Sequence, residues 1–330
     1  MSDDNYTPPF TINHKIIDLV AQISEKIGLI EITSNMDTNP HLRRENRIKT
    51  IQSSLAIENN SLSIAQVTAI LDGKRILGPP DEITEVKNAF EAYDRLLSFN
   101  PYSLPDILKA HRLLMDQLNQ EAGLFRSGGV GVFDGKTVLH TAPSAKHVPS
   151  LVSQLMLWTK KSLAHPLIKS CVFHYEFEFI HPFADGNGRM GRMWQTLILC
   201  QWKKIFAWLP IETIIKERQA QYYQAIQQST KHTDAAFFIE FLLQAIVDTL
   251  AEVVSTAQVS DQVTVQVNLL LAKLGVETLS AKELMAKVGL KHRQNFRKNY
   301  LQPALDQNKI IMAIPDKPNS SQQKYRRVIN

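Results

Sequence analysis

Hydrophobic residues recur every three or four positions along most of the chain, which is the spacing of helices that bury one face. A predicted helix at about residues 82–97 has one apolar face, formed by Val86, Ala89, Phe90, Tyr93 and Leu97. Similar patterns and helix boundary signals predict further helices at about residues 44–57, 63–72, 104–118, 151–163, 167–179, 188–203, 211–228 and 234–255. The fold is therefore expected to be mainly α.

One stretch breaks the helical pattern. Five glycines between residues 123 and 147 interrupt any helix. Three β-prone residues precede the pair Asp134-Gly135 and two follow it: Val130, Val132, Phe133, Val138 and Leu139. An Asp-Gly pair between short β-prone runs is typical of a β-hairpin, so a hairpin is predicted here.

The end of the chain has its own order of elements. A helix at about residues 264–274 precedes the capping-box pattern Ser280-Ala-Lys-Glu283, a short helix, a basic helix at about 291–305, and β-prone runs at 310–314 and 324–329. This is the order of a small winged helix-turn-helix domain. We expect three regions: an N-terminal helical region (1–80), a central core (81–257) and a winged-helix-like domain (258–330).

Composition adds limits on location. Of the 330 residues, 44% are hydrophobic and 21% are charged, which is ordinary for a globular chain. The two cysteines lie in apolar stretches and form no zinc-site pattern. The most apolar stretch, residues 235–254, contains Glu240, Asp248 and Glu252, which argues against a membrane span. The start of the chain is polar and does not resemble a signal peptide. We expect a cytoplasmic protein without membrane contact.

The formal net charge of +5 is concentrated at one end. Residues 276–330 contain 11 Lys and Arg against 4 Asp and Glu, a net of +7, which leaves −2 for the remainder. The cationic residues of the basic helix and the expected wing are Lys291, His292, Arg293, Arg297, Lys298, Lys324, Arg326 and Arg327. This arrangement suits DNA phosphates, while protein contacts or a plain charged surface stay open.

The segment His181-Pro-Phe-Ala-Asp-Gly-Asn-Gly-Arg-Met-Gly-Arg192 has the residues of an anion site. Gly186 and Gly188 allow backbone N–H groups to approach a phosphate, and a helix starting near Gly188 adds its positive end. Arg189 and Arg192, three residues apart, project from one face of its first turn. The segment is therefore expected to bind phosphate groups.

Two neighbouring residues add chemistry to this anion site. Asp185 is a hard oxygen ligand suited to a Mg²⁺ that bridges phosphates, and His181 can act as a base near neutral pH. The chain has no Gly-x-x-x-x-Gly-Lys-Ser/Thr and is not a P-loop protein. Together the residues predict attack on a nucleotide phosphate.

The segment matches the Fic family motif, His-x-Phe-x-Asp/Glu-Gly-Asn-Gly-Arg-x-x-Arg, at every fixed position. The chain resembles this family more loosely over about residues 44–255. The resemblance implies a helical Fic core with a β-hairpin flap, and transfer of AMP from ATP to a Ser, Thr or Tyr hydroxyl of a target protein. The flap would hold the target peptide by strand addition.

The resemblance also implies roles for single residues. His181 would take the proton of the target hydroxyl, Asp185 would hold Mg²⁺, and Phe183 would be a buried anchor. The expected nucleotide contacts are Gly186, Asn187, Gly188, Arg189, Arg192, and, on the adenine side, Tyr222 and Tyr223. For the two tyrosines a place in the core is an equal alternative.

A second motif lies near the N-terminus. Ser54-Leu-Ala-Ile-Glu58-Asn-Asn60 resembles the family's inhibitory motif, Ser/Thr-x-x-x-Glu-Gly/Asn-Asn. Ser54 and Glu58 are four apart and share a helix face. The resemblance implies that Glu58 pairs with Arg192 and blocks the position of the γ-phosphate of ATP.

Other functions stay open beside an AMP transferase. One is a DNA-binding regulator whose Fic domain senses a nucleotide. Another is a Fic enzyme that transfers a different phosphate-containing group or removes AMP. The chain itself, as a target of its own activity, and a homodimer are further partners to be tested.

Overall fold

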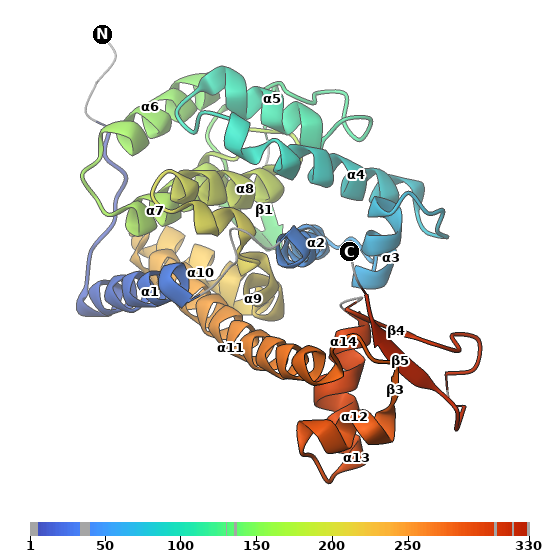
Figure 1. Cartoon of the computed structure of the whole chain (residues 1–330). Helices are drawn as coiled ribbons and strands as arrows, with labels where there is room; N and C mark the ends of the chain where they lie inside the picture. The colour runs from blue at the N-terminus through green and yellow to red at the C-terminus, as the bar shows by residue number, and fades with distance from the viewer. Residues whose placement is uncertain are drawn as a thin grey trace. The chain divides into compact units, whose positions relative to one another are not determined.

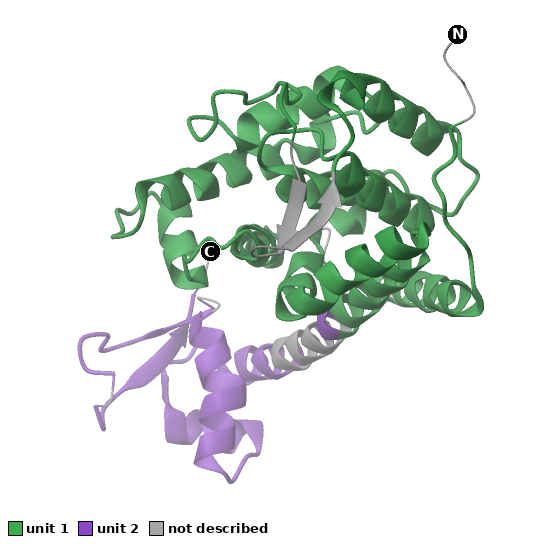
Figure 2. Cartoon of the chain, turned by 180° about the vertical axis from the view of Figure 1, so that it is seen from behind, with its two compact units in different colours: residues 1–251 green, residues 252–330 purple. Residues whose placement is uncertain are grey.

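The computed structural model describes residues 6–33, 40–129, 131–134, 137–306, 309–318 and 320–328. The chain divides into two compact units, Met1–Ala251 and Glu252–Asn330 (Figure 2). Helices dominate, so the prediction of a mainly α fold is confirmed (Figure 1). In the described part of the chain, no helix has both the length and the apolar character that a membrane crossing needs.

The first unit is built from helices and one hairpin. In chain order the elements are α1 (His14–Thr33), α2 (Pro40–Ile57), α3 (Ile64–Leu71), α4 (Pro80–Asp94), η1 (Leu96–Ser98), α5 (Leu104–Leu114), β1 (Gly131–Asp134), β2 (Thr137–Thr141), η2 (Ala145–His147), α6 (Val148–Lys161), α7 (Pro166–Ile180), α8 (Asn187–Cys200), η3 (Lys204–Trp208), α9 (Ile211–Glu217) and α10 (Gln219–His232). Helix α11 (Ala236–Leu274) begins in this unit and ends in the next.

Helices α7 and α8 form the centre of the first unit, where they lie side by side (Figure 1). Nearly every residue of both helices is buried, including Phe173, Phe177 and Trp194 at 0% exposure. Helix α7 is apolar on nearly all sides, which explains why its sequence shows little periodicity. The connection between α7 and α8 contains the His181–Arg192 motif, so the site is held by the best-packed part of the fold.

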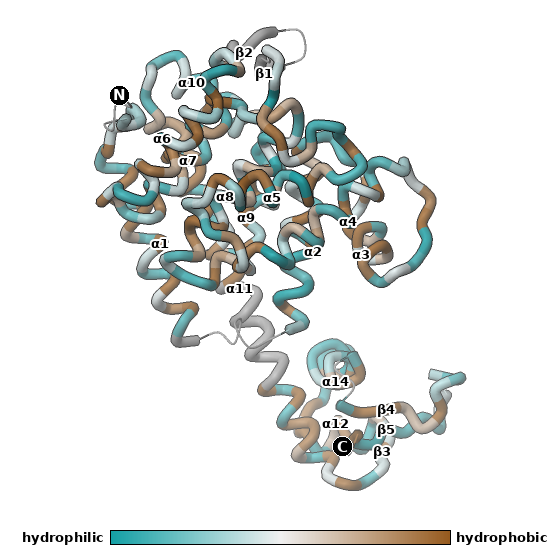
Figure 3. The backbone as a smooth tube through the Cα atoms, turned by 90° about the horizontal axis from the view of Figure 1, so that it is seen from above, coloured by the Kyte–Doolittle hydropathy of each residue, from teal (hydrophilic) through white to brown (hydrophobic). Residues whose placement is uncertain are grey.

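Helix α1 was not among the predicted helices. Its buried residues follow the spacing of an amphipathic helix: Ile16, Leu19, Ile23, Ile27 and Ile30. The alternation of apolar and polar positions along α1 is visible in Figure 3. Each such burial contributes about 1.5–3 kcal/mol, so this face firmly attaches α1. The spacing of these apolar residues in the sequence is the signal that predicts this helix.

Several of the predicted helices differ from the observed ones in number or length. The helix predicted at 211–228 is two helices, α9 and α10, which meet at Arg218. Nothing in the residue types there predicts the break. The helices predicted at 234–255 and 264–274 are one continuous helix, α11, because the stretch between them contains neither Gly nor Pro. The helix predicted at 82–97 ends at Asp94 and continues as the short turn η1.

The predicted hairpin is present. Strands β1 and β2 pair antiparallel, with Gly131 opposite Thr141 and Asp134 opposite Thr137, and the register shifts once, at Val132/Phe133. Val130 and Gly135 of the predicted hairpin lie outside the described residues.

The second unit contains the elements expected of a winged helix-turn-helix. After α11 come β3 (Leu279–Ser280), α12 (Ala281–Val288), α13 (Arg293–Phe296), the π-helical turn η4 (Arg297–Leu301), α14 (Gln302–Asp306), β4 (Ile310–Met312) and β5 (Lys324–Arg327). The strands form one antiparallel sheet in the order β3-β5-β4. Strand β3 was not predicted because two residues are too short to show a pattern.

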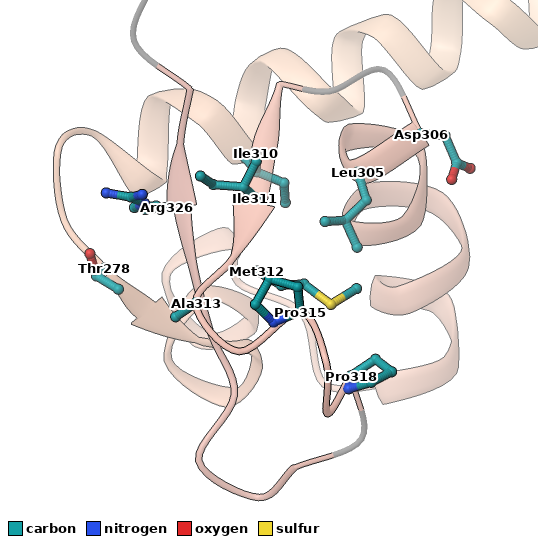
Figure 4. A pocket seen from close by; sticks show the side chains of 10 residues that line it. All are labelled: Thr278, Leu305, Asp306, Ile310, Ile311, Met312, Ala313, Pro315, Pro318 and Arg326. Carbon is teal, nitrogen blue, oxygen red and sulfur yellow. The ribbon is translucent and has the colours of Figure 1, made fainter.

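This unit has a hydrophobic core of its own. It includes Leu270 and Leu274 of α11, Leu284, Phe296, and Tyr325 of β5. An open groove runs beside β4, the edge strand, and its apolar lining includes Leu305, Met312 and Pro315 (Figure 4). The predicted boundaries at residues 80 and 257 stay predictions.

Candidate active site

The loop between α7 and α8 is fixed by two residues with positive φ. Helix α7 ends where His181 takes the left-handed conformation, with φ 50° and ψ 62°. Helix α8 begins after Gly186, whose φ is 81°. A Cβ atom at Gly186 would also lie 2.7 Å from Sδ of Met115, so only glycine fits there. The turn thus places His181 and the N-terminus of α8 at the two ends of one short loop.

Asn187 holds the loop closed from inside. Its Oδ1 accepts a hydrogen bond of 2.9 Å from the Phe183 N–H, and its Nδ2 donates one of 2.9 Å to the Phe183 carbonyl. Phe183 is fully buried, as its expected role as an anchor requires. Because the Asn187 side chain holds the loop in this way, we expect its backbone N–H to make the phosphate contact.

His111 of α5 also supports the loop, although it lies outside both sequence motifs. Its ring stacks on Phe183 with 3.6 Å between ring centroids. Its Nδ1 accepts a hydrogen bond from the Gly123 N–H, so Nε2 carries the proton and donates to the Asp185 carbonyl at 3.0 Å. Burial lowers the pKa of His111 to about 4, so the ring is neutral near pH 7 and keeps this tautomer.

Arg189 lies between two carboxylates. Its Nη1 donates to Oε1 of Glu85 at 2.6 Å, and its Nη2 lies 3.2 Å from Oδ1 of Asp185. The Arg189 side chain is buried, whereas the Asp185 side chain is 59% exposed. Asp185 therefore offers an accessible carboxylate beside the start of α8, which fits a Mg²⁺ ion that takes its other ligands from phosphates and water.

Arg192 is buried and points back toward the end of α2. Its Nε donates to Oγ of Ser54 at 3.1 Å, and its Nη2 donates to the Ser54 carbonyl at 3.0 Å and to Oε1 of Glu58 at 2.7 Å. Its Nη1 faces Gly188 and has no hydrogen-bond partner among the described residues. A buried donor without a partner is costly, so an anion above Gly188 would complete the site.

The Glu58 carboxylate lies beside that place and pairs with Nη2 of Arg192, not with Nη1. A Cβ atom at Gly188 would collide with Oε1 of Glu58, which shows how closely the carboxylate approaches the first turn of α8. The cap residue Gly186 offers no side chain to the free N–H groups of this turn. Glu58 is thus the anion at a helix N-terminus whose chemistry suits phosphate.

Asn60 contacts a different part of the site. Its Nδ2 donates to Oε2 of Glu85 at 2.8 Å, and Glu85 in turn binds Arg189. Asn60 is therefore linked through Glu85 to Arg189, whereas Ser54 and Glu58 contact Arg192. Sequence reasoning missed Glu85, which lies on α4 and outside both motifs.

The two tyrosines differ in their surroundings. Tyr222 is buried, with its hydroxyl 3.2 Å from Nε2 of His174 and its ring packed against Phe238. This position agrees with the core alternative. Tyr223 is partly exposed and meets the Tyr222 ring edge-on at 5.3 Å. Contact of either tyrosine with adenine stays a prediction.

A buried titratable pair lies behind Arg192. Glu178 is 8% exposed, and its Oε1 has no hydrogen-bond partner in the described part of the chain. Burial, followed by the charge of Glu58, raises the pKa of Glu178 to about 8. Burial also lowers the pKa of its neighbour His174 to about 3. Both side chains are thus uncharged near pH 7.

We expect Glu178→Gln to change how stability depends on pH. Between pH 4.5 and pH 8 the folded wild type holds a proton on Glu178 that the unfolded chain releases. The free energy of unfolding therefore falls as pH rises through this window, by at most about 1.4 kcal/mol per pH unit. The glutamine of the variant has no such proton, so the free energy of unfolding of the variant does not fall for this reason. The stability of Glu178→Gln minus that of wild type should therefore increase from pH 4.5 to pH 8. Urea unfolding at both pH values measures this, and a constant difference would contradict it.

Comparisons with known proteins agree with this site. Residues 101–199 match the Fic/DOC family, and residues 265–327 match the C-terminal domain of Fic-like proteins (filamentation induced by cAMP). Protein adenylyltransferase Fic of Aedes aegypti is 30% identical over 237 residues, which are 66% of this chain and 44% of that protein. The chain thus spans less than half the length of this curated relative.

Solved structures extend the similarity to the whole chain. A Fic family protein from Desulfovibrio desulfuricans G20 is 50% identical, with a TM-score of 0.76 over 98% of this chain and 99% of that one. A Fic-domain signaling protein from Bacteroides thetaiotaomicron has a TM-score of 0.58 at 19% identity over 74% of this chain and 98% of that one, which shows a shared fold alone. With an intact motif and a relative matched end to end, this chain belongs to the Fic family.

Proposed function

We propose that this chain transfers AMP from ATP to a Ser, Thr or Tyr hydroxyl of a target protein. The observation that carries this proposal is the position of His181, one short loop away from a helix N-terminus next to two buried arginines. Curated relatives named protein adenylyltransferase support the reaction type.

Each motif residue has a role in the proposed reaction. The hydroxyl oxygen attacks the α-phosphorus of ATP, the bond to the β-phosphate oxygen breaks, and pyrophosphate leaves. His181 accepts the hydroxyl proton. The backbone N–H groups of residues 186–188 and the Arg189 guanidinium hold the phosphates, and Asp185 would hold a Mg²⁺ ion, which would supply positive charge to them. Arg192 orients the γ-phosphate.

Glu58 is proposed to inhibit this reaction. Its carboxylate contacts Arg192 and approaches Gly188, and a γ-phosphate needs the same positive groups. Two anions cannot share one guanidinium fork and one helix N-terminus without strong repulsion. Bound ATP would then have its α-phosphate out of line for attack.

The position of the label in ATP tests the reaction type. Compared with lysate alone, added Glu58→Gly protein should increase the transfer of label from α-labelled ATP to protein and should not increase transfer from γ-labelled ATP. Transfer from the γ-position would indicate a kinase, and transfer from other nucleotides would favour a different phosphate-containing group. Mass spectrometry of the labelled proteins would identify the target, including the chain itself.

A second candidate function is DNA binding by the C-terminal unit. The residues of α13 and η4 that face solvent include Arg293, Arg297 and Lys298, and no acidic residue occurs between Lys291 and Gln302. Exposed Gln294 and Asn295 on the same helical segment are types that can read base edges. Strand β5 adds exposed Lys324, Arg326 and Arg327. A DNA-binding regulator with a nucleotide-sensing Fic domain would use this surface.

We expect the full chain to bind duplex DNA with an affinity that falls steeply as salt increases. Replacing both Arg297 and Lys298 with alanine should lower the slope of log K against log salt by about 1.8, because each lost phosphate contact contributes about 0.9. Lys287→Ala is the control, since Lys287 already pairs with Glu277 at 2.6 Å. Fluorescence anisotropy gives these slopes. Absence of binding at low salt would exclude this function.

A further inference from the structure

Arg126 is a buried arginine that neither motif includes. It is 3% exposed and lies just before the hairpin. Its guanidinium donates to four backbone carbonyls: to His181 from Nε at 2.7 Å, to Gly128 from Nη1 at 2.8 Å, and from Nη2 to Pro143 at 2.5 Å and Ile180 at 3.3 Å. In the described part of the chain no carboxylate forms an ion pair with it. Carbonyl oxygens alone therefore solvate this buried charge.

The four acceptors come from two separate structures. The carbonyls of Ile180 and His181 are at the end of α7, where a helix has unpaired carbonyls and the negative end of its dipole. Gly128 precedes β1 and Pro143 follows β2, so their carbonyls mark the entrance and exit of the hairpin. One side chain thus joins both ends of the hairpin to the residue proposed as the base.

Further contacts strengthen this junction. The Arg126 N–H donates to the Pro182 carbonyl at 3.0 Å. The Phe125 ring stacks on the Phe183 ring with 5.6 Å between centroids. Residues 125 and 126 therefore bind the His181 loop through a ring, a backbone amide and a guanidinium, while the same guanidinium closes the base of the hairpin.

We propose that Arg126 is a positioning residue that holds the hairpin and His181 in one fixed arrangement. It would act through these two structures and not by contact with ATP. This inference rests on the proposed function, in which the hairpin holds the target and His181 accepts its proton. The hydroxyl of a target peptide bound to the hairpin would then lie at a fixed distance from the His181 imidazole. In-line attack on the α-phosphorus requires such a fixed geometry.

Lysine cannot replace arginine in this role. The guanidinium presents five N–H donors on three nitrogens in a rigid plane, so it can reach carbonyls on several sides at once. A lysine ammonium is a single point with three donors. Arg126→Lys keeps the charge and loses at least part of this set of bonds, which makes it the informative variant.

The test uses Arg126→Lys in the full chain, in the Glu58→Gly background. We expect amide hydrogen exchange to increase at residues 127–129, 131–134 and 137–145, because the hairpin loses its attachment. We expect kcat for transfer to protein to fall about 10²-fold, the cost of a misplacement of about 1 Å, while the Kd for ATP is unchanged. The matched control is Arg47→Lys, since buried Arg47 also donates to a carbonyl, that of Tyr93, at 2.6 Å.

The exchange measurement separates this inference from the proposed function. If the Glu58→Gly chain labels no protein, the proposed function fails, and local exchange still tests the attachment of the hairpin. Unchanged hairpin exchange in Arg126→Lys would overturn the inference, as would faster exchange with an unchanged kcat. Exchange that increases equally in α1, or in Arg47→Lys, would show a general loss of stability and would also overturn it.

Discussion

His181→Ala is expected to reduce AMP transfer by about 10²–10⁴-fold, the usual contribution of a general base. Binding of ATP should persist, because the groups proposed to hold the phosphates, Arg189, Arg192 and the start of α8, are retained. The rate of label transfer from α-labelled ATP and the Kd for ATP by calorimetry measure the two effects. Both measurements use the Glu58→Gly background, in which we expect transfer to be fast enough for a decrease to be measured.

A second variant guards against a trivial loss of structure. His181 adopts the left-handed conformation, which alanine disfavours. His181→Asn accepts that conformation but supplies no base, so it should be as inactive as His181→Ala. The control is His147→Ala, because His147 is exposed and its replacement should leave the transfer rate unchanged. Transfer at the starting rate by either His181 variant would exclude His181 as the base.

Glu58→Gly is expected to increase AMP transfer about 10²-fold or more, with a smaller effect on ATP affinity. The reason is that a misplaced α-phosphate reduces the rate by about 10²-fold for a shift of about 1 Å, while the nucleotide stays bound. Radiolabel incorporation at saturating ATP, compared between wild type and variant, measures the increase. Labelling of the chain itself is expected to rise as well.

The double variant Glu58→Gly/Arg192→Ala tests the partner. It should not regain activity, since the γ-phosphate then lacks the guanidinium proposed to orient it. Glu58→Asp keeps the charge on a shorter side chain and should give an intermediate rate. Equal incorporation by wild type and Glu58→Gly would mean that residues 54–60 are an ordinary helix end.

The motif residues could be predicted because they are contiguous. A histidine, an aspartate, two glycines and two arginines in fixed order within twelve residues specify their own local geometry, so one loop and one helix start bring them together. The pairing of Glu58 with Arg192, 134 positions apart, was expected from a second motif and not from any physical pattern. This long-range pairing follows from the family resemblance, because the periodicity of hydrophobic residues says nothing about which distant side chains meet.

The supporting residues could not be predicted in the same way. His111, Glu85 and Arg126 act on the motif across 74, 104 and 55 positions. Each looks like an ordinary helix or loop residue, and its role depends on where distant segments meet. Asn187 shows the reverse case, since its position in the motif suggested a phosphate contact while its side chain binds the loop backbone.

The two hydrogen bonds between Arg192 and Ser54 have a consequence for how the proposed inhibition would be released. They involve Nε and one donor of Nη2, so neither bond depends on the contact with Glu58. The Arg192 guanidinium is therefore already placed to bind a γ-phosphate. To free it, only the Glu58 side chain, which is 33% exposed, would have to rotate away. In the proposed inhibition, any ligand or partner that favours an outward rotamer of Glu58 would raise the active fraction.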